Sequence, residues 1–509
     1  MQLSKSEYMM YLRHPSLVWY KKFDKTKLPP DDDNRLAIYA EGNYFETFAE
    51  QLFEDGIRIG FNSYDEYLQM PRFTKEAIST GKKVIFQSRF ETEKITCICD
   101  VVKFLDENTV ELYEIKSSSS VKQENIYDLA FQTHVLQLNG FNVKEIFVIH
   151  VNGNYVRSGE ISPREICNVA NITEEVLAEI DDTKLIIDEI FEFLKTKTPP
   201  SFDPPLDGEG DINAWLELFL FNNPQEKGSI FDLCWPKNRI AELYQMGIKN
   251  LIDIPDDFSL SPKQKLQVSA AKNDLVTVDK KKIKEFIDGF EYPLYFLDYE
   301  TLASVIPPFD GLGPRKQLPF QFSLHVLEEP GGALQHYSYL HRDNSDPTTP
   351  LSEALKEHIG TSGTVLTWNE RFEKSCNDLM GKVAPKYKNF YKKLNERIAD
   401  LCIPFQKNWY IHKDFLGSYS IKKVLPVIVP ELSYADLDIN EGASAQRLWM
   451  KSVLADQYAD QKEKILNDLD IYCELDTLAM VKIYEHLYSL VEEHKANEEN
   501  QIVEKLTLF

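Results

Sequence analysis

The sequence predicts an α/β protein built from more than one domain. Two β-rich runs enclose a short polar turn within residues 97–116, and a helical pattern at 125–138 and an apolar strand at 143–151 follow. A second series of strand and helix patterns begins near residue 291. Because 509 residues suffice for two to four domains, we expect domains at 1–200 and 291–509, joined by a helical segment at 201–290.

The composition is that of a folded, acidic protein. Hydrophobic residues make up 43% of the chain and charged residues 27%, which allows sizeable cores. The net charge of −24 argues against broad, non-specific binding of nucleic acid, because such binding depends on neutralising phosphates. A nucleic-acid path must therefore be local or be supplied by a protein partner. The chain shows no long apolar run, no N-terminal signal core and no disulfide framework, so we expect a cytoplasmic protein without a membrane partner.

The two β-rich runs at 97–116 predict a hairpin that brings acidic side chains together. Pairing around a turn near residue 107 places Asp100 roughly opposite Glu114. Side chains alternate along a strand, so Glu114 and Lys116 share one face. Two carboxylates this close repel each other, and a hard divalent cation such as Mg²⁺ or Mn²⁺ relieves the repulsion. Lys116 can then orient a water or a phosphate oxygen. The alternative is a surface hairpin with solvated charges.

The order of an Asp, a hairpin, a Glu-x-Lys motif and a helix carrying a Gln resembles the PD-(D/E)XK nuclease superfamily. The similarity is to its RecB-like branch, which includes CRISPR-associated adaptation nucleases. It implies a restriction-endonuclease-like mixed sheet with flanking helices, metal binding by Asp100 and Glu114, and a catalytic Lys116. Gln132 stands where the family has its catalytic-site glutamine, but the Tyr that the family has four residues later is Leu136 here.

A further metal ligand is expected on the first long helix. Apolar residues at helical spacing across 44–53 predict this helix. The resemblance implies a Glu or a His on it that completes the metal site. Glu46 is favoured by its offset from Gly42, and Glu41 and Glu50 are the alternatives.

The resemblance also bears on an iron–sulfur cluster. In RecB-like relatives that hold one, a Cys stands where this chain has His14, and three more follow the nuclease core. The corresponding stretch, about 200–235, contains only Cys234. We therefore expect no iron–sulfur cluster, and we interpret His14 as a histidine at a helix end rather than as a metal ligand.

Residues 201–290 form the predicted connection between the domains. A Pro- and Gly-rich linker leads into a helical segment, in which residues 241–255 resemble a helix-hairpin-helix element. Such an element presents backbone N–H groups that can hold a phosphate, and a plain helical spacer is the alternative. The densest basic run follows, at Lys280, Lys281 and Lys282. It predicts either a DNA-facing patch or the solvated start of a helix.

A second acidic constellation is predicted in residues 291–509. Asp298 and Glu300 end a buried strand and point to one face. A strand at 365–369 leads into a helix with Glu373, and near the end Tyr472 and Asp476 are four residues apart, hence on one helix face. Four such carboxylates can hold two divalent cations, one activating water and one stabilising the leaving oxygen.

This order of motifs resembles the DEDD exonucleases of the RNase-H-like fold, in their tyrosine subtype. The resemblance implies that Tyr472 orients the attacking water and that the metal ligands are Asp298, Glu300, Glu373 and Asp476. The family's middle carboxylate is usually Asp, so Glu373 departs from the pattern, and Asp378 and Asp400 are the fallback candidates. Lys422 lies in a segment similar to the one that follows the family's middle motif, and we add it to the nucleic-acid-binding candidates.

The two motif sets together resemble a bacterial family of RecB-like nucleases with a DEDD-like C-terminal region. They imply a metal-dependent nuclease that hydrolyses phosphodiester bonds through a PD-(D/E)XK site and a DEDD-like 3′–5′ exonuclease site. DNA is the favoured substrate, because RecB-like relatives act on DNA, and RNA stays open. The alternatives are a nucleic-acid-binding or assembly scaffold with one or both sites inactive, and a protein with a single working centre.

Overall fold

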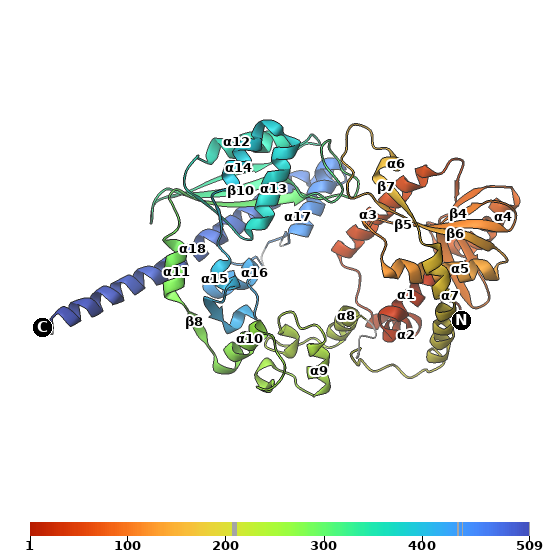
Figure 1. Ribbon diagram of the computed structural model, residues 1–509, viewed down its shortest axis with the longest axis horizontal. Coiled ribbons are helices and arrows are strands. Elements are labelled where there is room, and N and C mark those ends of the chain that lie inside the picture. The colour runs from red at the N-terminus through yellow and green to blue at the C-terminus, as the bar shows by residue number, and fades with distance from the viewer. Residues whose placement is uncertain (206–210, 435–436, 440, 508–509) are drawn as a thin grey trace. The chain divides into compact units, whose positions relative to one another are not determined.

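The computed structural model describes residues 1–205, 211–434, 437–439 and 441–507. The chain divides into two compact units, which we call the first unit (Met1–Gln225 with Ser304–Arg315) and the second unit (Glu226–Ala303 with Lys316–Phe509). The predicted connection at 201–290 is thus shared between the two units. Each unit contains a mixed β-sheet with flanking helices, which confirms the predicted α/β fold (Figure 1).

The sheet of the first unit has seven strands. They are β1 (Leu3–Ser4), β2 (Ile57–Arg58), β3 (Val84–Glu91), β4 (Ile95–Phe104), β5 (Thr109–Lys116), β6 (Asn142–Val151) and β7 (Cys167–Asn171). The order is β2-β3-β4-β5-β6-β7, and β1 pairs with the start of β4. The sheet is mixed, because β2–β3 and β5–β6 are parallel and the other neighbours along this order are antiparallel.

The predicted hairpin is the pair β4–β5. Val101 pairs with Tyr113 in antiparallel register, and one further step of this register sets Asp100 beside Glu114. Leu112 packs in the hydrophobic core on one side of the sheet, and Glu114 lies two residues later on the same side. The alternation of the strand therefore aims this acidic pair at one layer of helices.

Helices cover both faces of the first sheet. They are α1 (Lys5–Arg13), α2 (Pro15–Phe23), α3 (Asp33–Ala49), α4 (Tyr64–Ser79), α5 (Gln123–Leu138), α6 (Pro163–Ile166), α7 (Thr173–Phe193) and α8 (Ile212–Asn222). On the face of Leu112, α1, α5 and α7 contribute Tyr8, Phe131 and Ile180 to one core. On the other face, α3 contributes Phe45 to a second core.

The main sheet of the second unit has five strands in the order β11-β10-β9-β12-β13. These are β9 (Leu294–Leu302), β10 (Leu318–Leu327), β11 (Leu334–Leu340), β12 (Thr364–Thr367) and β13 (Ile398–Asp400). The central strand β9 is antiparallel to β10 and parallel to β12. Ser323 on β10 pairs with Asp298 on β9, and Gln321 pairs with Glu300. A separate two-stranded sheet joins β8 (Val276–Val278) to β14 (Tyr410–His412).

Helices also cover both faces of the second sheet. The helices of the second unit are α9 (Arg239–Gln245), α10 (Pro262–Asn273), α11 (Lys280–Ile287), α12 (Thr348–His358), α13 (Glu370–Val383), α14 (Lys388–Asn395), α15 (Ile403–Gln406), α16 (Ile421–Ile428), α17 (Gly442–Trp449) and α18 (Lys462–Thr507). Of these, α12, α13, α17 and α18 pack against the sheet. On one face α18 packs against β9, where the rings of Tyr484 and Phe296 are 5.7 Å apart. On the other face the Tyr299 hydroxyl donates to Asn377 of α13 at 2.8 Å. Figure 1 shows α18 and α13 on opposite sides of this sheet.

The segment before β9 contains the predicted helix-hairpin-helix and basic run. Helix α9 is followed by a single 3₁₀ turn at Leu251–Asp253, and the next α-helix begins only at Pro262. Residues 241–255 thus hold one α-helix and one 3₁₀ turn rather than two α-helices. Lys280 opens helix α11, so the basic run is the start of a helix. None of the described helices has the length and apolar composition that crossing a bilayer requires.

Candidate functional site

Three carboxylates converge in the second unit. Asp298 and Glu300 belong to β9, and Asp476 belongs to α18. One donor oxygen from each lies within 4.8 Å of the others. The three residues line a cavity of about 410 Å³, together with Tyr472 and Lys422. The structure thus brings together three of the four acids that the sequence assigned to this site, with both of their predicted neighbours.

Local geometry explains this convergence. Asp298 and Glu300 are two residues apart on β9, so both point to the face covered by α18. Tyr472 and Asp476 are one helical turn apart on α18, so both point back to the strand. The first residue of α17 forms part of the wall, because a Cβ at Gly442 would lie 3.7 Å from Oε2 of Glu300.

Burial disfavours the charged form of these three carboxyl groups. Burial, followed by the charge of Asp476, raises the pKa of Asp298 well above its ordinary value. Burial and the two neighbouring carboxylates raise the pKa of Glu300 in the same way. Burial also raises the pKa of Asp476 to about 6, against opposing effects of nearby hydroxyl and ammonium groups. Clustered carboxyl groups of this kind hold protons or cations, and an all-oxygen donor set fits Mg²⁺ or Mn²⁺.

A tyrosine that sequence reasoning missed belongs to this site. The Tyr434 hydroxyl donates to Oδ1 of Asp476 at 2.7 Å. The Nζ of Lys422 lies 5.5 Å from the ring centre of Tyr434 and 5.4 Å from that of Tyr472. Tyr434 follows α16 in a stretch without helical or strand periodicity, so no pattern in the sequence pointed to it. Its bond orients Asp476 toward the other acids.

The fourth predicted acid, Glu373, lies apart from the group of three. It is on α13, only 1% exposed, and its Oε2 has no hydrogen-bond partner. Burial and then the charge of Asp298 raise its pKa well above the ordinary value, so the two acids are electrostatic neighbours. Of the fallback candidates, Asp400 accepts backbone N–H groups at the start of α13, and Asp378 is exposed. Glu373 therefore remains the acid best placed to join the site.

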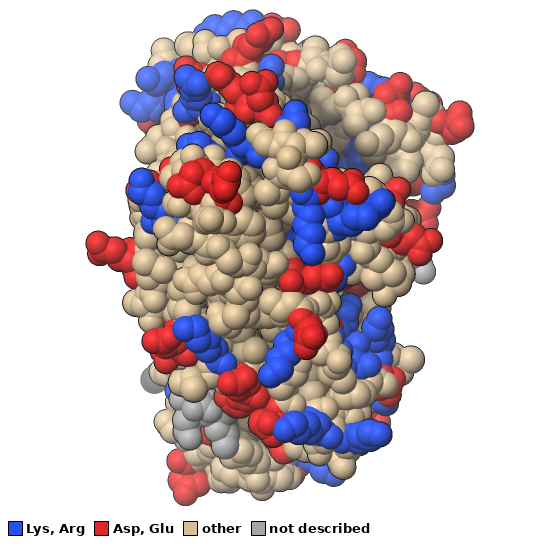
Figure 2. All heavy atoms as spheres, turned by 90° about the vertical axis from the view of Figure 1, so that its right-hand side faces the viewer, with Lys and Arg blue, Asp and Glu red and all other residues tan. Residues whose placement is uncertain are grey.

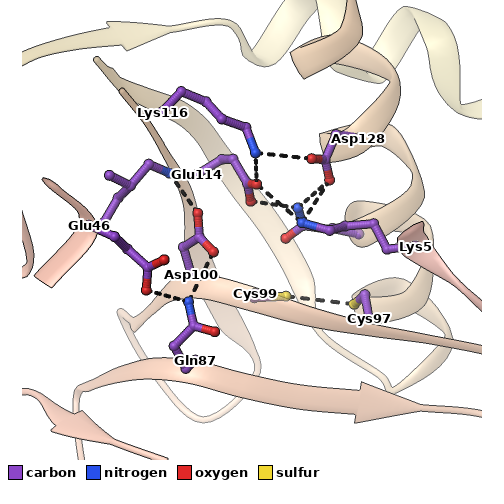
Figure 3. Close-up of polar contacts among 11 residues, drawn as sticks. Lys5, Glu46, Gln87, Cys97, Cys99, Asp100, Glu114, Lys116 and Asp128 are labelled. Carbon is purple, nitrogen blue, oxygen red and sulfur yellow. Dashed lines mark hydrogen bonds and ion pairs between the residues drawn. The ribbon is translucent and has the colours of Figure 1, made fainter. Parts of the chain in front are cut away.

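The residues predicted at the hairpin of the first unit form one polar network (Figure 3). The Nζ of Lys5 lies 3.1 Å from both Oε1 of Glu114 and Oδ1 of Asp128. The ammonium of Lys116 pairs with Glu114 and, at 3.3 Å, with Asp128. Nε2 of Gln132 donates to Glu114 at 2.7 Å and to Asp128 at 2.8 Å. Two ammonium groups and an amide therefore already compensate these two carboxylates.

Asp100 lies beside this network and is linked to Glu46. Its Oδ2 accepts the backbone N–H of Ile115 at 2.8 Å. Nε2 of Gln87 donates both to Oδ1 of Asp100 at 3.1 Å and to Oε1 of Glu46 at 2.6 Å (Figure 3). The backbone of Gln87 has a left-handed φ of 50°, an uncommon conformation for a residue other than glycine. Such strain concentrates at functional sites, and here it accompanies a residue that joins two acids.

The two alternatives to Glu46 have other partners: Glu41 lies on α3, and Glu50 begins the 3₁₀ turn that follows α3. Oε1 of Glu41 accepts the backbone N–H of Val305 at 2.7 Å, and Glu50 pairs with Arg58. Arg58 also reaches Glu46 at 3.2 Å. Of these three acids, Glu46 is the one that shares a hydrogen-bond donor with Asp100.

Charges in the first unit are balanced differently from those in the second. Burial lowers the pKa of Lys5, but Asp128, Glu114 and Asp100 outweigh burial and raise it well above its ordinary value. Carboxylates likewise raise the pKa of Lys116 against burial, so both lysines are charged. Within the described residues, groups of three metal-binding side chains with donor atoms within 4.8 Å lie in the second unit, and none includes the hairpin acids.

Three residues of the first-unit network were missed from the sequence. Asp128 precedes Gln132 by four residues on α5, so helical spacing could have identified it. Lys5 and Gln87 come from α1 and β3, and only the packing of those elements against the hairpin brings them in.

The basic candidates divide between the start of α11 and the carboxylate cavity of the second unit. Lys282 pairs with Asp279 at 2.9 Å, at the start of α11, and Lys280 and Lys281 belong to the same helical turn. Lys422 lines the 410 Å³ cavity of the second unit. On the face shown in Figure 2, Lys and Arg side chains are interspersed with Asp and Glu. An area without charged side chains separates the charged residues above it from those below it. That face offers no uniform basic track for a phosphate backbone.

His14 and the cysteines have ordinary structural positions. Nδ1 of His14 accepts the backbone N–H of Ser16 at 3.3 Å, so His14 caps α2, as the sequence interpretation expected. Its Nε2 lies 3.2 Å from the carbonyl oxygen of Asp203. The cysteines are free thiols, and Cys234 is partly buried. The expectation that no iron–sulfur cluster binds stays a prediction.

Two comparisons with known proteins bear on this chain. A family model described as a domain of unknown function (DUF2779) matches residues 295–420. This span includes Asp298, Glu300 and Glu373 but ends before Tyr472 and Asp476. The uncharacterized protein UU173 of Ureaplasma parvum serovar 3 is 23% identical over 344 residues, which cover 59% of this chain and 46% of that protein. The chain therefore spans less than half the length of this curated relative.

Proposed function

We propose that this protein is a metal-dependent nuclease whose working centre lies in the second unit. The observation that carries the proposal is the convergence of Asp298, Glu300 and Asp476 on one cavity, with donor oxygens within 4.8 Å of one another. The raised pKa of each acid reflects the cost of uncompensated negative charge in this cavity, which a bound cation would relieve. The resemblance of the motifs to DEDD exonucleases supports the same reaction class, with 3′–5′ removal of nucleotides.

The chain's own residues account for orientation and charge at this centre. When bound, Mg²⁺ or Mn²⁺ supplies Lewis acidity toward water and phosphate oxygens. Asp298, Glu300 and Asp476 would hold the cations, and Glu373 extends the set from α13. Tyr472 lines the cavity beside Asp476, where its hydroxyl can orient a water. Lys422 places a positive charge at the cavity, where it can bind the phosphate of a substrate.

The network around Asp100, Glu114 and Lys116 is the second proposed centre, of the PD-(D/E)XK type. Its residue types and connections agree with that resemblance, including the contact of Gln132 with Glu114. The ion pairs of Lys5 and Lys116 favour a form in which the carboxylates are already compensated. This centre therefore has two possible roles. Either it binds metal after Lys5 moves away from Glu114, or it helps to position the substrate while hydrolysis takes place in the second unit.

DNA is the proposed substrate, with RNA as the alternative, and the proposed setting is the cytoplasm. The net charge of −24 confines contact with nucleic acid to local sites such as Lys422 and the start of α11, or to a basic protein partner. A scaffold with inactive sites is the competing hypothesis, and the position of Glu373 outside the group of three acids favours it.

The experiment uses the full chain with end-labelled single- and double-stranded DNA and RNA, in Mn²⁺, Mg²⁺ or EDTA. Three variants are compared with the wild type: Asp298→Asn/Glu300→Gln, Asp100→Asn/Lys116→Met, and the exposed control Asp378→Asn. We expect metal-dependent shortening from the 3′ end that the first variant loses and the control keeps. Loss only in the Asp100→Asn/Lys116→Met variant would move the working centre to the first unit. A wild type that cuts no substrate in either metal contradicts the nuclease proposal.

A further inference from the structure

Two histidines and a glutamate meet on the second unit, on the far side of α18 from the proposed catalytic acids. His325 on β10 and His336 on β11 are directly paired across the two strands, and their ring centres are 4.4 Å apart. Glu474 of α18 is the third member, and one donor atom of each residue lies within 4.8 Å of the others. Residues two apart on a helix point about 200° apart, so Glu474 and Asp476 face different sides of α18.

Hydrogen bonds around the histidines leave their remaining nitrogens as acceptors. A backbone carbonyl can only accept, so the Thr477 hydroxyl donates to the carbonyl oxygen of Glu474, 3.1 Å away. That proton is then in use, and Nδ1 of His325, 2.8 Å from the Thr477 oxygen, must donate to it. Nε2 of His325 therefore carries a lone pair, which is the metal-binding state of an imidazole.

The second histidine, His336, also keeps one nitrogen as an acceptor. Ser323 lies 2.6 Å from the Thr477 oxygen and donates to it, since the proton of Thr477 is already used. Nε2 of His336, 2.9 Å from the Ser323 oxygen, then donates to Ser323. Nδ1 of His336 is left with a lone pair 3.8 Å from Oε1 of Glu474. Two solvent-accessible acceptors at this separation can be bridged by a water or by a metal ion.

Burial favours the neutral form that metal binding requires. His325 is 3% exposed, and burial, followed by the proximity of His336, lowers its pKa to about 4. His336 and Glu474 are more accessible, with side chains 26% and 49% exposed, so an ion can enter from solvent. Ser323 and Thr477 supply the outer hydrogen bonds that orient ligating histidines in known metal sites.

We propose that His325, His336 and Glu474 bind one transition-metal ion of the Zn²⁺ class, separate from the carboxylate centre. Two imidazoles and one carboxylate are a common Zn²⁺ donor set that leaves a position for water. An all-oxygen group, by contrast, suits Mg²⁺ or Mn²⁺. The ion would join β10 and β11 to α18 at Glu474, between Tyr472 and Asp476. It would thus fix the helix that carries both of those side chains. This inference does not rest on the proposed nuclease activity.

Metal binding to the full chain tests the proposal directly. Zn²⁺ affinity is measured by competition with a chromophoric chelator, and Co²⁺ serves as a probe because nitrogen ligands give it visible absorption. We expect one Co²⁺ with visible absorption in the wild type and in Asp298→Asn/Glu300→Gln. His336→Gln and Glu474→Gln should lose that absorption. Their Kd for Zn²⁺ should rise by more than the roughly 10- to 100-fold typical of outer hydrogen-bond partners.

Further variants separate ligation from folding. Glu474 and His336 are partly exposed, so their substitutions test the site even if His325→Gln fails to fold. Thr477→Val should weaken Zn²⁺ by roughly 10- to 100-fold while leaving the ligands in place. His358→Gln is the matched control, because His358 stacks on Tyr337 and is not part of the group. Unchanged Zn²⁺ affinity in His336→Gln and Glu474→Gln would overturn the proposal. The proposal would also be overturned if Asp298→Asn/Glu300→Gln were the only variant that abolished Zn²⁺ binding.

Discussion

The Nζ of Lys5 lies 3.1 Å from Oε1 of Glu114, although the two residues are 109 positions apart in the sequence. The contact forms because β1, immediately before Lys5, pairs in parallel with the start of β4. The same ammonium lies 3.1 Å from Asp128. In the proposed PD-(D/E)XK centre, Lys5 would therefore compete with a metal ion for the Glu114 carboxylate.

Lys5→Met should strengthen Mn²⁺ binding in the first unit. Removing one ammonium leaves Glu114 and Asp128 undercompensated, and we expect Kd to fall roughly 10-fold, equivalent to about 1.4 kcal/mol. Calorimetric titration in an Asp298→Asn/Glu300→Gln background removes the carboxylate centre of the second unit from the measurement. Lys22→Met is the matched control, because Lys22 is equally shielded and pairs with Glu7 at 2.7 Å. Weaker Mn²⁺ binding in Lys5→Met would show instead that Lys5 helps to build the site.

Acid should destabilise the wild type more than a His14→Asn variant. Burial lowers the pKa of His14, against the opposing effect of the Asp203 carbonyl. The unfolded chain therefore takes up a proton near pH 6.5 before the folded chain does. Stability from this group is complete above about pH 6.5 and declines as the pH falls toward the lowered folded value, by at most about 1.4 kcal/mol per pH unit. Protonation of Nδ1 also removes the acceptor for Ser16.

Urea unfolding at about pH 7.5 and about pH 5.5 measures this difference. Asn is a good N-cap and does not titrate in this range, so His14→Asn keeps a cap for α2 without the proton linkage. On going from the higher to the lower pH, the free energy of unfolding should fall more for the wild type than for His14→Asn. An equal fall in the two proteins would mean that His14 titrates alike in the folded and unfolded chains.

The local parts of both sites could be predicted from the sequence. The hairpin register that joins Asp100 to Glu114 follows from two β-rich runs and a short turn. Asp298 and Glu300 share a face because of the strand period of two, and Tyr472 and Asp476 share one because of their helix spacing of four. Both periods are visible in the residues themselves. Prediction succeeded where each side chain's direction depends on its own strand or helix.

The missing parts depend on which elements pack together. Lys5 reaches Glu114 only through the pairing of β1 with β4, and Tyr434 reaches Asp476 from a stretch with no regular period. Glu373 shows the converse limit. Its place after β12 was correctly expected, but its separation from the group of three acids depends on how α13 packs in the unit. Spacing in the sequence does not determine such packing.

Tyr434→Phe should reduce hydrolysis without unfolding the second unit. The change removes the hydroxyl that donates to Asp476 at 2.7 Å and keeps the ring. Hydrogen bonds to charged groups contribute about 1.5–3 kcal/mol, so the rate should fall roughly 10-fold or more if Asp476 must stay oriented. Single-turnover rates in Mn²⁺ measure the effect, with Tyr488→Phe farther along α18 as the control. Equal rates for the two variants would assign Tyr434 a purely structural role.

Glu373 and Asp400 should respond in opposite ways to loss of charge. Glu373 has a buried oxygen without a partner and a pKa raised by burial and by Asp298, so Glu373→Gln removes an acid whose charged form the fold disfavours. We expect its hydrolysis rate to fall while its urea midpoint stays level or rises. Asp400 accepts the backbone N–H groups of Asn369, Glu370 and Cys402. Asp400→Asn should therefore cost about 1–3 kcal/mol of stability, with the rate per folded molecule unchanged.

Comparison of this pair decides whether Glu373 belongs to the metal centre. If Glu373 holds a cation, Glu373→Gln weakens Mn²⁺ binding, because an amide oxygen replaces a charged ligand. If it is only a buried acid, the Mn²⁺ affinities of Glu373→Gln and wild type coincide and the rate is retained. The second result would reduce the centre to Asp298, Glu300 and Asp476. It would also explain why the structure leaves the fourth acid outside their reach, since a centre of three carboxylates would not need Glu373 to approach.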